Sequence, residues 1–430
     1  MSSPSRPPSY LVVLRTPQTC RAFGAALLGR LSYGTVFLSL VLALTAATGS
    51  YAVAGGVMAL FGLASSLLSP LRAGLIDRYG SRRALPPMAV LYALLLTCLA
   101  AATWQPGTSG ALLAALAVAA GACTPPLGPV MRALWSDLLP DRQLLQRAYS
   151  LDTVAEESLF VTGPLLAGLL AAFATPAAGV GLSAVLVLTG TFAFVLSPAV
   201  RTAQALHAGT PHDGPRTDPA PSTSRWRWMR GAAGLGRPVA VSAAVGLCLG
   251  ALSLLMVVFA ERYHQAAAVA WVEAALSVGS AVGGLAYGAF SWRVSGQVRL
   301  PVLAAALGLT LAAAGLSPNL YVLVAVVGVA GLFVAPVLTT AYLLADESAA
   351  PHNRTRAGAW VNTAFNTGSS SGTATIGLLV GSLPLALCFA VVAVPPLLAA
   401  ATALGRPRPV TVSTSSRDAG KTGHDPILKR

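Results

Sequence analysis

The chain has 430 residues, of which 55% are hydrophobic and only 10% are charged, whereas a soluble globular domain carries about 25% charged residues. This composition excludes an ordinary water-soluble protein, because too few polar groups remain to cover a folded surface. The net charge of +14 suits a nucleic-acid-binding protein, but the basic residues lie in short segments between long apolar runs, so that class is excluded as well.

Twelve apolar segments are long enough to cross a bilayer, for which a helix needs about 20 residues. We therefore predict an all-α membrane protein with 12 transmembrane helices surrounded by the lipid bilayer. The segments run over 22–47, 51–72, 84–104, 109–131, 151–175, 178–199, 238–260, 268–290, 300–317, 319–344, 357–380 and 383–404.

The positions of the basic residues predict the orientation. If the N-terminus is cytoplasmic, every Lys and Arg lies in a cytoplasmic segment except Arg262, in an outer loop, and Arg30, inside the first span. Cytoplasmic loops of membrane proteins carry an excess of Lys and Arg, so we expect both termini in the cytoplasm and the protein in an inner or plasma membrane. The excess of Arg over Lys, together with abundant Ala and Gly, is typical of a GC-rich bacterial genome.

One long polar segment, 200–237, separates the first six spans from the last six. It is rich in Pro, Ser, Thr and Arg, so we expect a largely flexible cytoplasmic linker. The predicted organisation is a cytoplasmic N-terminal segment (1–21), a six-helix bundle (22–199), the linker (200–237), a second six-helix bundle (238–404) and a cytoplasmic tail (405–430).

The two halves resemble each other internally. A shift of 210 residues places the segment 151–156 on the segment 361–366 and Pro126 on Pro336. The match falls at the start of the fifth span of each half. Parallel six-helix repeats with a binding site at their interface are one plan of secondary transporters.

The loop after the second span contains an acid among basic residues. Gly80 suits a tight turn, and Asp77 can pair with a basic neighbour or face a helix N-terminus. In this loop the sequence resembles the major facilitator superfamily, whose signature is a Gly, then Asp-Arg, one residue, Gly and two basic residues. The residues that carry the resemblance are Gly74 (one position late), Asp77, Arg78, Gly80, Arg82 and Arg83.

The resemblance implies a fold of two pseudo-symmetric six-helix bundles that rock around a central cavity. It also implies that this loop forms a cytoplasmic gate, held by Asp77. The corresponding segment of the second half, 286–293, keeps Gly288 but has no Asp.

The fifth span contains Gly163 and Pro164, which resemble part of the Gly-Pro motif of drug–proton antiporters in the superfamily. The alternative is a kink with small residues for close helix packing. Many family members also carry an Arg within the fourth span. We expect this chain to lack it, because Arg132 follows the end of the segment 109–131.

Charged residues inside the spans are candidate site residues, because each is costly in hydrocarbon. They are Arg30, Glu156, Glu157 and Glu273, with Asp152 at the membrane boundary. Arg30 can serve the site or extend its side chain back to the cytosol. We expect Glu273 to be solvated near the outer surface.

Helical spacing places Asp152 and Glu156 on one face of the fifth span and turns Glu157 about 100° away. The matching face of the second half carries Asn362 and Asn366. We expect these faces to line the cavity, with Glu156 binding and releasing a proton while Arg30 moves toward and away from it. The alternative is that the acids only stabilise the helix N-terminus through its dipole.

The sequence predicts no cofactor and no metal site. Its five Cys lack metal or redox spacing, and its five His lie in predicted loops or tails. The segment 420–422, Gly-Lys-Thr, lacks the earlier Gly of a phosphate-binding loop. We therefore expect an ion gradient or the substrate gradient, rather than ATP, to drive the protein.

These observations favour a monomeric secondary transporter, not an enzyme, that exports a small apolar or amphipathic compound in exchange for protons by alternating access. Uptake or facilitated diffusion by the same fold is the first alternative. A polytopic membrane enzyme, or a receptor or scaffold without transport, is the second.

Overall fold

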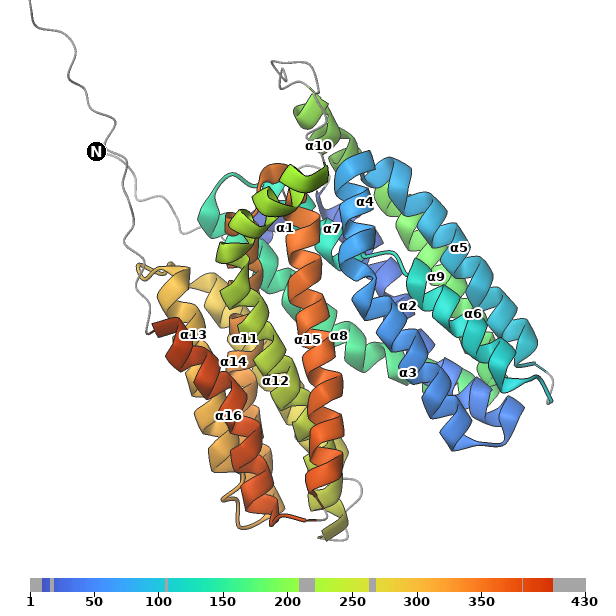
Figure 1. Ribbon diagram of the computed structural model, residues 1–430, viewed down its shortest axis with the longest axis vertical. Coiled ribbons are helices and arrows are strands. Elements are labelled where there is room, and N and C mark those ends of the chain that lie inside the picture. The colour runs from blue at the N-terminus through green and yellow to red at the C-terminus, as the bar shows by residue number, and fades with distance from the viewer. Residues whose placement is uncertain are drawn as a thin grey trace, which may run out of the picture.

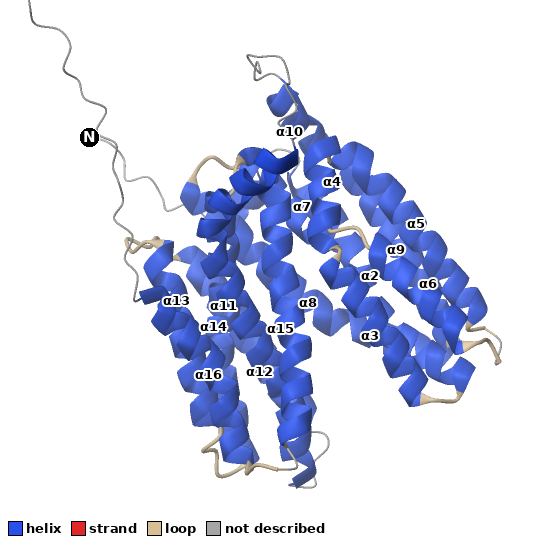
Figure 2. Cartoon of the chain, in the orientation of Figure 1, coloured by secondary structure: helices blue, strands red, loops and turns tan. Residues whose placement is uncertain are grey.

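The computed structural model describes residues 10–15, 19–104, 107–208, 221–262, 268–380 and 382–404. In these ranges the chain is helical throughout, with no strand (Figures 1 and 2). The first ten helices are α1 (Tyr10–Arg15), α2 (Thr19–Thr48), α3 (Tyr51–Leu67), α4 (Ser69–Tyr79), α5 (Ser81–Ala102), α6 (Gly110–Cys123), α7 (Leu127–Leu138), α8 (Arg142–Phe173), α9 (Pro176–Leu196) and α10 (Pro198–Ala208). The others are α11 (Pro221–Arg262), α12 (Ala268–Ala289), α13 (Gly296–Ala314), α14 (Leu320–Ser348), the 3-10 turn η1 (Pro351–Asn353), α15 (Arg354–Leu379) and α16 (Leu385–Leu404).

Eleven helices of the described ranges are long and apolar enough to cross a membrane. Two of them are broken helices, α3 with α4 and α6 with α7. The remaining crossing helix is α15, whose polar run 366–373 lowers its hydropathy. It is nevertheless held in its bundle, because Gly368 and Gly372 lie against the backbone of α11 where no Cβ fits. The predicted all-α membrane fold of 12 helices is confirmed.

The helices form two bundles that lie together at one end and diverge toward the other (Figure 1). The first bundle contains α2 to α9 and the second α11 to α16, while α8 also packs against α12 and α14. The buried cores follow the same division. One hydrophobic cluster joins the linker-side half of the first bundle to the second bundle, and a separate cluster fills the far half of the first bundle. The bundles are thus joined on the side of the linker.

Several helices extend further than the apolar runs suggest. The second, fourth and fifth crossing helices are Tyr51–Tyr79, Gly110–Leu138 and Arg142–Phe173, because polar residues continue the helices beyond the apolar core. The expectation of a largely flexible linker is wrong where the structure describes it, since α10 reaches Ala208 and α11 begins at Pro221. Residues 209–220, the segment 1–9 and the tail 405–430 lie outside the described residues.

Glycines let α8 approach α2 closely. A Cβ built on Gly163 would lie 2.5 Å from the backbone of Gly34, too close for any side chain. Small residues at such crossings allow helix backbones to pack tightly in membranes. The close-packing role weighed for Gly163 is therefore observed, and the contact fixes the depth at which α8 presents its charged residues to α2.

Candidate functional site

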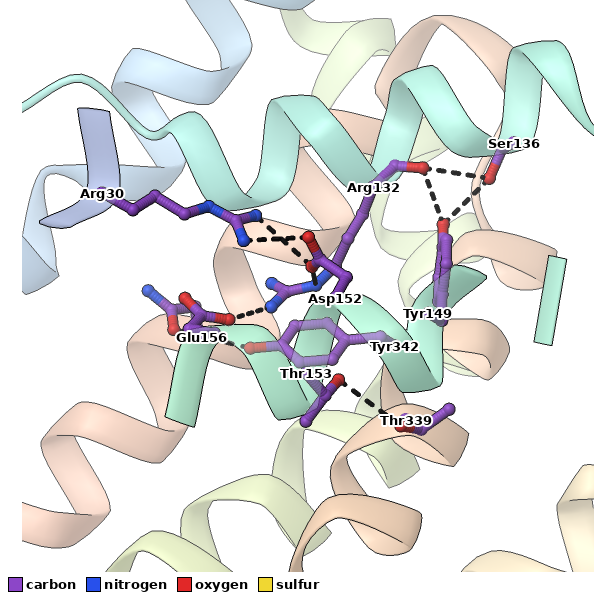
Figure 3. A network of polar contacts seen from close by, with 10 residues as sticks. Arg30, Arg132, Ser136, Tyr149, Asp152, Thr153, Glu156, Thr339 and Tyr342 are labelled. Carbon is purple, nitrogen blue, oxygen red and sulfur yellow. Dashed lines mark hydrogen bonds and ion pairs between the residues drawn. The ribbon is translucent and has the colours of Figure 1, made fainter. Parts of the chain in front are cut away.

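Four charged side chains meet inside the first bundle (Figure 3). Arg30 on α2 donates hydrogen bonds to both carboxylate oxygens of Asp152 on α8, at 2.8 and 3.3 Å. On α7, Arg132 has its Nε 2.9 Å from Asp152 Oδ2 and donates through its terminal nitrogen to Glu156 Oε2. We call these four residues the ionic network; its two positive and two negative charges balance.

The network is buried. Arg30 and Arg132 are 2% exposed and Asp152 is 0% exposed, whereas the Glu156 side chain is 24% exposed. Arg30 therefore does not extend to the cytosol. Removing one partner from such a pair leaves a buried charge uncompensated, which costs about 3–5 kcal/mol.

Sequence reasoning missed Arg132, and the expectation that the fourth span lacks an Arg is wrong. The span does not end at residue 131, because it breaks at Pro125 and Pro126 and restarts as α7 at Leu127. Arg132 thus lies five residues inside α7. The sequence signal for this arrangement is the pair Pro125 and Pro126, because prolines can break a helix within one span.

The position of the acids on α8 also differs from the prediction. Because α8 begins at Arg142, Asp152 is not at a helix end and Glu156 lies 14 residues from the first residue of the helix. A helix dipole acts on charges within its first turn. The alternative that these acids only stabilise a helix N-terminus is therefore excluded.

Residues of the second bundle complete the surroundings of the network. The Arg132 guanidinium carbon lies 3.7 Å from the centre of the Tyr342 ring on α14, and the Tyr342 hydroxyl donates to Asn362 Oδ1 on α15 at 3.5 Å. Thr339 and Thr153 make another contact between the bundles, at 3.4 Å (Figure 3). The ionic network is thus attached to the facing bundle by neutral groups.

A cavity of about 210 Å³ lies between the bundles next to the network. Five helices line it, and they come from both halves of the chain. The lining residues are Thr153, Glu156, Glu157, Phe160, Val161, Leu249, Glu273, Leu276, Ser277, Ser280, Val334, Leu338, Tyr342, Asn362, Phe365 and Asn366.

The cavity brings together most of the predicted site residues. Glu156, Asn362 and Asn366 line it as expected, while Arg30 and Asp152 lie behind Glu156, outside its lining. The expectation that Glu157 points elsewhere is wrong, because Glu157 lines the same cavity. Glu273 lines this cavity as well, and it is an exposed residue, which agrees with its expected solvation. Helical spacing gave the angle between Glu156 and Glu157, but a cavity between two bundles is wide enough to admit both.

The predicted gate residue Asp77 lies at the contact between the bundles. Its Oδ2 accepts a hydrogen bond of 2.9 Å from the backbone N–H of Arg356, in the first turn of α15. The carboxylate therefore faces the N-terminus of a helix in the other bundle. Gly80 ends α4 with φ +82°, a conformation that favours glycine.

The other motif residues lie near the hydrogen bond between Asp77 and Arg356 but do not take part in it. Arg78, Arg82 and Arg83 are not buried, and Gly74 lies beside α15, where a Cβ would be 3.7 Å from Arg356 Cδ. A neighbouring residue at the end of the segment 51–72, Arg72, is buried. Its guanidinium donates to the carbonyls of Ser65, Gly121 and Ala122. Gly121 and Ala122 lie four residues before Pro125 and Pro126, which have no N–H to donate to these carbonyls.

Further contacts close the linker side of the molecule. Arg142 pairs with Glu347 at 2.5 Å and Arg354 with Asp137 at 3.3 Å, each joining the two bundles. Arg147 on α8 donates to the carbonyls of Gly288 and Ala289, at the end of α12. The structure is therefore closed on the linker side.

Within the described residues, no group of three or more His, Cys, Asp or Glu side chains is arranged to hold a metal ion. The polar groups of the cavity are carboxylates, amides and hydroxyls, set in an apolar and aromatic wall. Two bundles that meet around a mainly apolar cavity with a few polar groups, with ion pairs closing one side, are the arrangement of a multi-pass membrane transporter.

Comparisons with known proteins agree with this class. The family model described as Major Facilitator Superfamily matches residues 22–266 and 238–429, so the chain belongs to that family. No curated protein sequence matches it significantly.

Solved transporter structures share the fold at low sequence identity. The human organic anion transporter TETRAN is 17% identical, with a TM-score of 0.65, 90% of this chain and 99% of that one being covered. A bacterial homologue of the iron transporter ferroportin in an outward-facing state is 14% identical, with a TM-score of 0.64 and coverage of 90% and 97%. The fucose:proton symporter of E. coli is 13% identical, with a TM-score of 0.63 and coverage of 92% and 99%.

Proposed function

We propose that this transporter exports a small apolar or amphipathic compound in exchange for protons, by alternating access of the cavity between the bundles. The observation that carries the proposal is the ionic network, which is buried at Arg30 and Asp152 but reaches the cavity at Glu156. A buried ionisable group in a membrane protein marks a proton or substrate path more often than a structural role.

In this proposal Glu156 is the proton-binding residue. It is the network member that the cavity reaches, and its partner is Arg132 rather than the predicted Arg30. A proton on Glu156 cancels its charge and removes the attraction to Arg132, which keeps its contacts with Asp152 and the Tyr342 ring. Since Tyr342 belongs to the second bundle, protonation changes a contact between the bundles.

The direction of transport rests on two supports. Gly163 and Pro164 resemble part of the antiporter motif, and the distribution of Lys and Arg favours cytoplasmic termini and a cytoplasmic linker at 200–237. With that orientation, the closed side in the structure is cytoplasmic and protons reach Glu156 from outside. The structural neighbours do not decide direction or substrate, because they comprise an organic anion transporter, a homologue of an iron transporter and a proton symporter.

The orientation is tested with single cysteines at Ser222 and His264 in a variant that lacks the five native cysteines. An impermeant thiol reagent added to intact cells should label position 264 and spare position 222 until the membrane is opened. Labelling of position 222 alone in intact cells contradicts the orientation.

The coupling is tested with Glu156→Gln, which keeps the size and hydrogen bonding of the side chain but cannot take up a proton. In proteoliposomes with a pH gradient, uphill flux of exported dyes and its pH dependence should be lost, while downhill exchange survives. Asp141→Asn is the matched control, since Asp141 is an exposed helix cap away from the cavity and Asn caps equally well. Full uphill flux with an unchanged pH profile in Glu156→Gln rules out Glu156 as the coupling site.

A further inference from the structure

The cavity contains two carboxylates that the ionic network does not neutralise. Arg30 and Arg132 are both engaged by Asp152 and Glu156. Glu157 and Glu273 line the same cavity, and its described lining includes no Arg, Lys or His. When these two acids are ionised, the cavity is negatively charged.

One of the two acids lacks a polar partner at a buried atom. The Oε1 atom of Glu157 is buried without a hydrogen-bond partner. A buried carboxylate oxygen without a donor is costly, so a positive charge close to this carboxylate, in the cavity that Glu157 lines, is favoured. Glu157 lies on α8 of the first bundle and Glu273 on α12 of the second, so one ligand cation can interact with both halves of the transporter.

The rest of the wall suits an apolar or aromatic body. Phe160 and Phe365 come from opposite bundles, and Leu276 and Leu338 add aliphatic surface. Aromatic rings also attract cations through their faces. The cavity volume of about 210 Å³ is below the range of about 300–1,000 Å³ that holds drug-sized ligands, which favours a compact compound.

We propose that the transported compound is a compact amphipathic organic cation, whose charge lies between Glu157 and Glu273 and whose apolar part contacts Phe160 and Phe365. This inference rests on the proposed function, in which the cavity is the transport site. An organic anion would place its charge beside carboxylates with no free cation in the lining. The compounds that an organic anion transporter such as TETRAN carries therefore do not suit this cavity.

The test measures binding to the purified full-length protein in lipid nanodiscs, without any gradient. Two aromatic frameworks are used, each in three charge states of matched size. One set is N-methyl-4-phenylpyridinium, 4-phenylpyridine and biphenyl-4-carboxylate, and the other is N-methylquinolinium, quinoline and 2-naphthoate, all at pH 7.5. We expect each cation to bind at least about tenfold more tightly than its neutral and anionic counterparts.

Substitutions of Glu157 and Glu273 test whether these two acids cause the preference for cations. Glu157→Gln and Glu273→Gln should each weaken cation binding about tenfold, as expected for loss of one charged contact, and leave neutral binding unchanged. Glu157→Asp keeps the charge and should retain most of the preference, and Asp141→Asn should behave as the unmodified protein. Retained neutral binding and a cooperative unfolding transition at a melting temperature no lower than that of the unmodified protein show that the variants are folded.

Three results overturn the proposal: a carboxylate that binds as tightly as its matched cation, cation affinity that neither Gln variant alters, or no cation binding by the unmodified protein. The experiment is independent of proton coupling. Tight cation binding without uphill flux contradicts the coupling alone, whereas proton-driven export of a neutral or anionic compound contradicts the cation proposal alone.

Discussion

The two bundles place different chemistry at equivalent positions around the cavity. A shift of 210 residues carries Asp152 and Glu156 onto Asn362 and Asn366, and Arg132 onto Tyr342. Arg132 and Tyr342 also contact each other across the interface, at 3.7 Å. At these equivalent positions the first bundle supplies charges and the second supplies amides and an aromatic ring, while Glu273 of the second bundle lines the cavity elsewhere. We infer that a change of charge at Glu156 reaches the second bundle through the neutral contacts of Tyr342 and Asn362.

The halves match more closely at the closed linker side. Asp137 and Glu347 are equivalent under the same shift, and each pairs with an Arg near the start of a helix in the opposite bundle, Arg354 and Arg142. Asp77 has no such counterpart, because the segment 286–293 contains no acid. We therefore expect the two symmetric ion pairs to hold the bundles closed on the linker side. We expect Asp77, which has no counterpart, to control whether they close.

Asp152→Asn is the substitution with the largest expected effect, and it tests whether the charged residues of the first bundle matter more than the neutral residues at the equivalent positions of the second. This change leaves Arg30 and Arg132 with one carboxylate between them, and the buried uncompensated charge should cost about 3–5 kcal/mol. We expect a large fall in melting temperature in detergent and loss of transport. The equivalent change in the second bundle, Asn362→Ala, removes only a neutral contact and should have a much smaller effect; equal losses in the two variants contradict the difference.

Asp77→Asn tests the unmatched gate residue. A carboxylate at a helix N-terminus contributes about 0.3–2 kcal/mol, which changes the ratio of closed to open molecules by about 2- to 30-fold. We expect normal membrane insertion, a shift away from the closed linker side measured by cysteine accessibility, and a heavy loss of transport. Normal flux at equal membrane abundance removes Asp77 from the mechanism.

Substitutions of Tyr342 test how the second bundle responds to the ionic network. Tyr342→Leu removes the aromatic face below Arg132, worth about 0.5–2 kcal/mol, and should lower both the melting temperature and the pH sensitivity of transport. Tyr342→Phe keeps the ring and loses only a long hydrogen bond to Asn362, so it should differ little from the unmodified protein. A Phe variant as impaired as the Leu variant assigns the role to the hydroxyl instead.

The smallest effects are expected at the symmetric pairs. Exposed ion pairs contribute about 0–1 kcal/mol. Asp137→Asn should weaken closure more than Glu347→Gln, because the Asp137 side chain is 18% exposed and that of Glu347 is 40% exposed. Cysteine accessibility on the linker side measures both, and a larger effect of Glu347→Gln contradicts this order.

The sequence by itself determined the 12 helices and the lipid surroundings. It also placed Glu156, Asn362 and Asn366, which line one cavity. These features follow from local properties, because the length of an apolar run sets whether a helix crosses a membrane and helical spacing sets which residues share a face. The segment that forms α15 was also found in this way, as one of the twelve apolar runs, at 357–380.

Only the tertiary structure decided the partners of the charges. Arg132 belongs to the network because the fourth span does not end after residue 131 but continues as α7 beyond the break at Pro125 and Pro126. It also requires that α8 packs so that Asp152 contacts Arg132. Glu157 and Glu273 lie far apart in the sequence, and they share a cavity only because α8 packs against α12 across the bundle interface. The depth and pairing of a charge in a membrane depend on neighbouring helices, which no single segment of the sequence specifies.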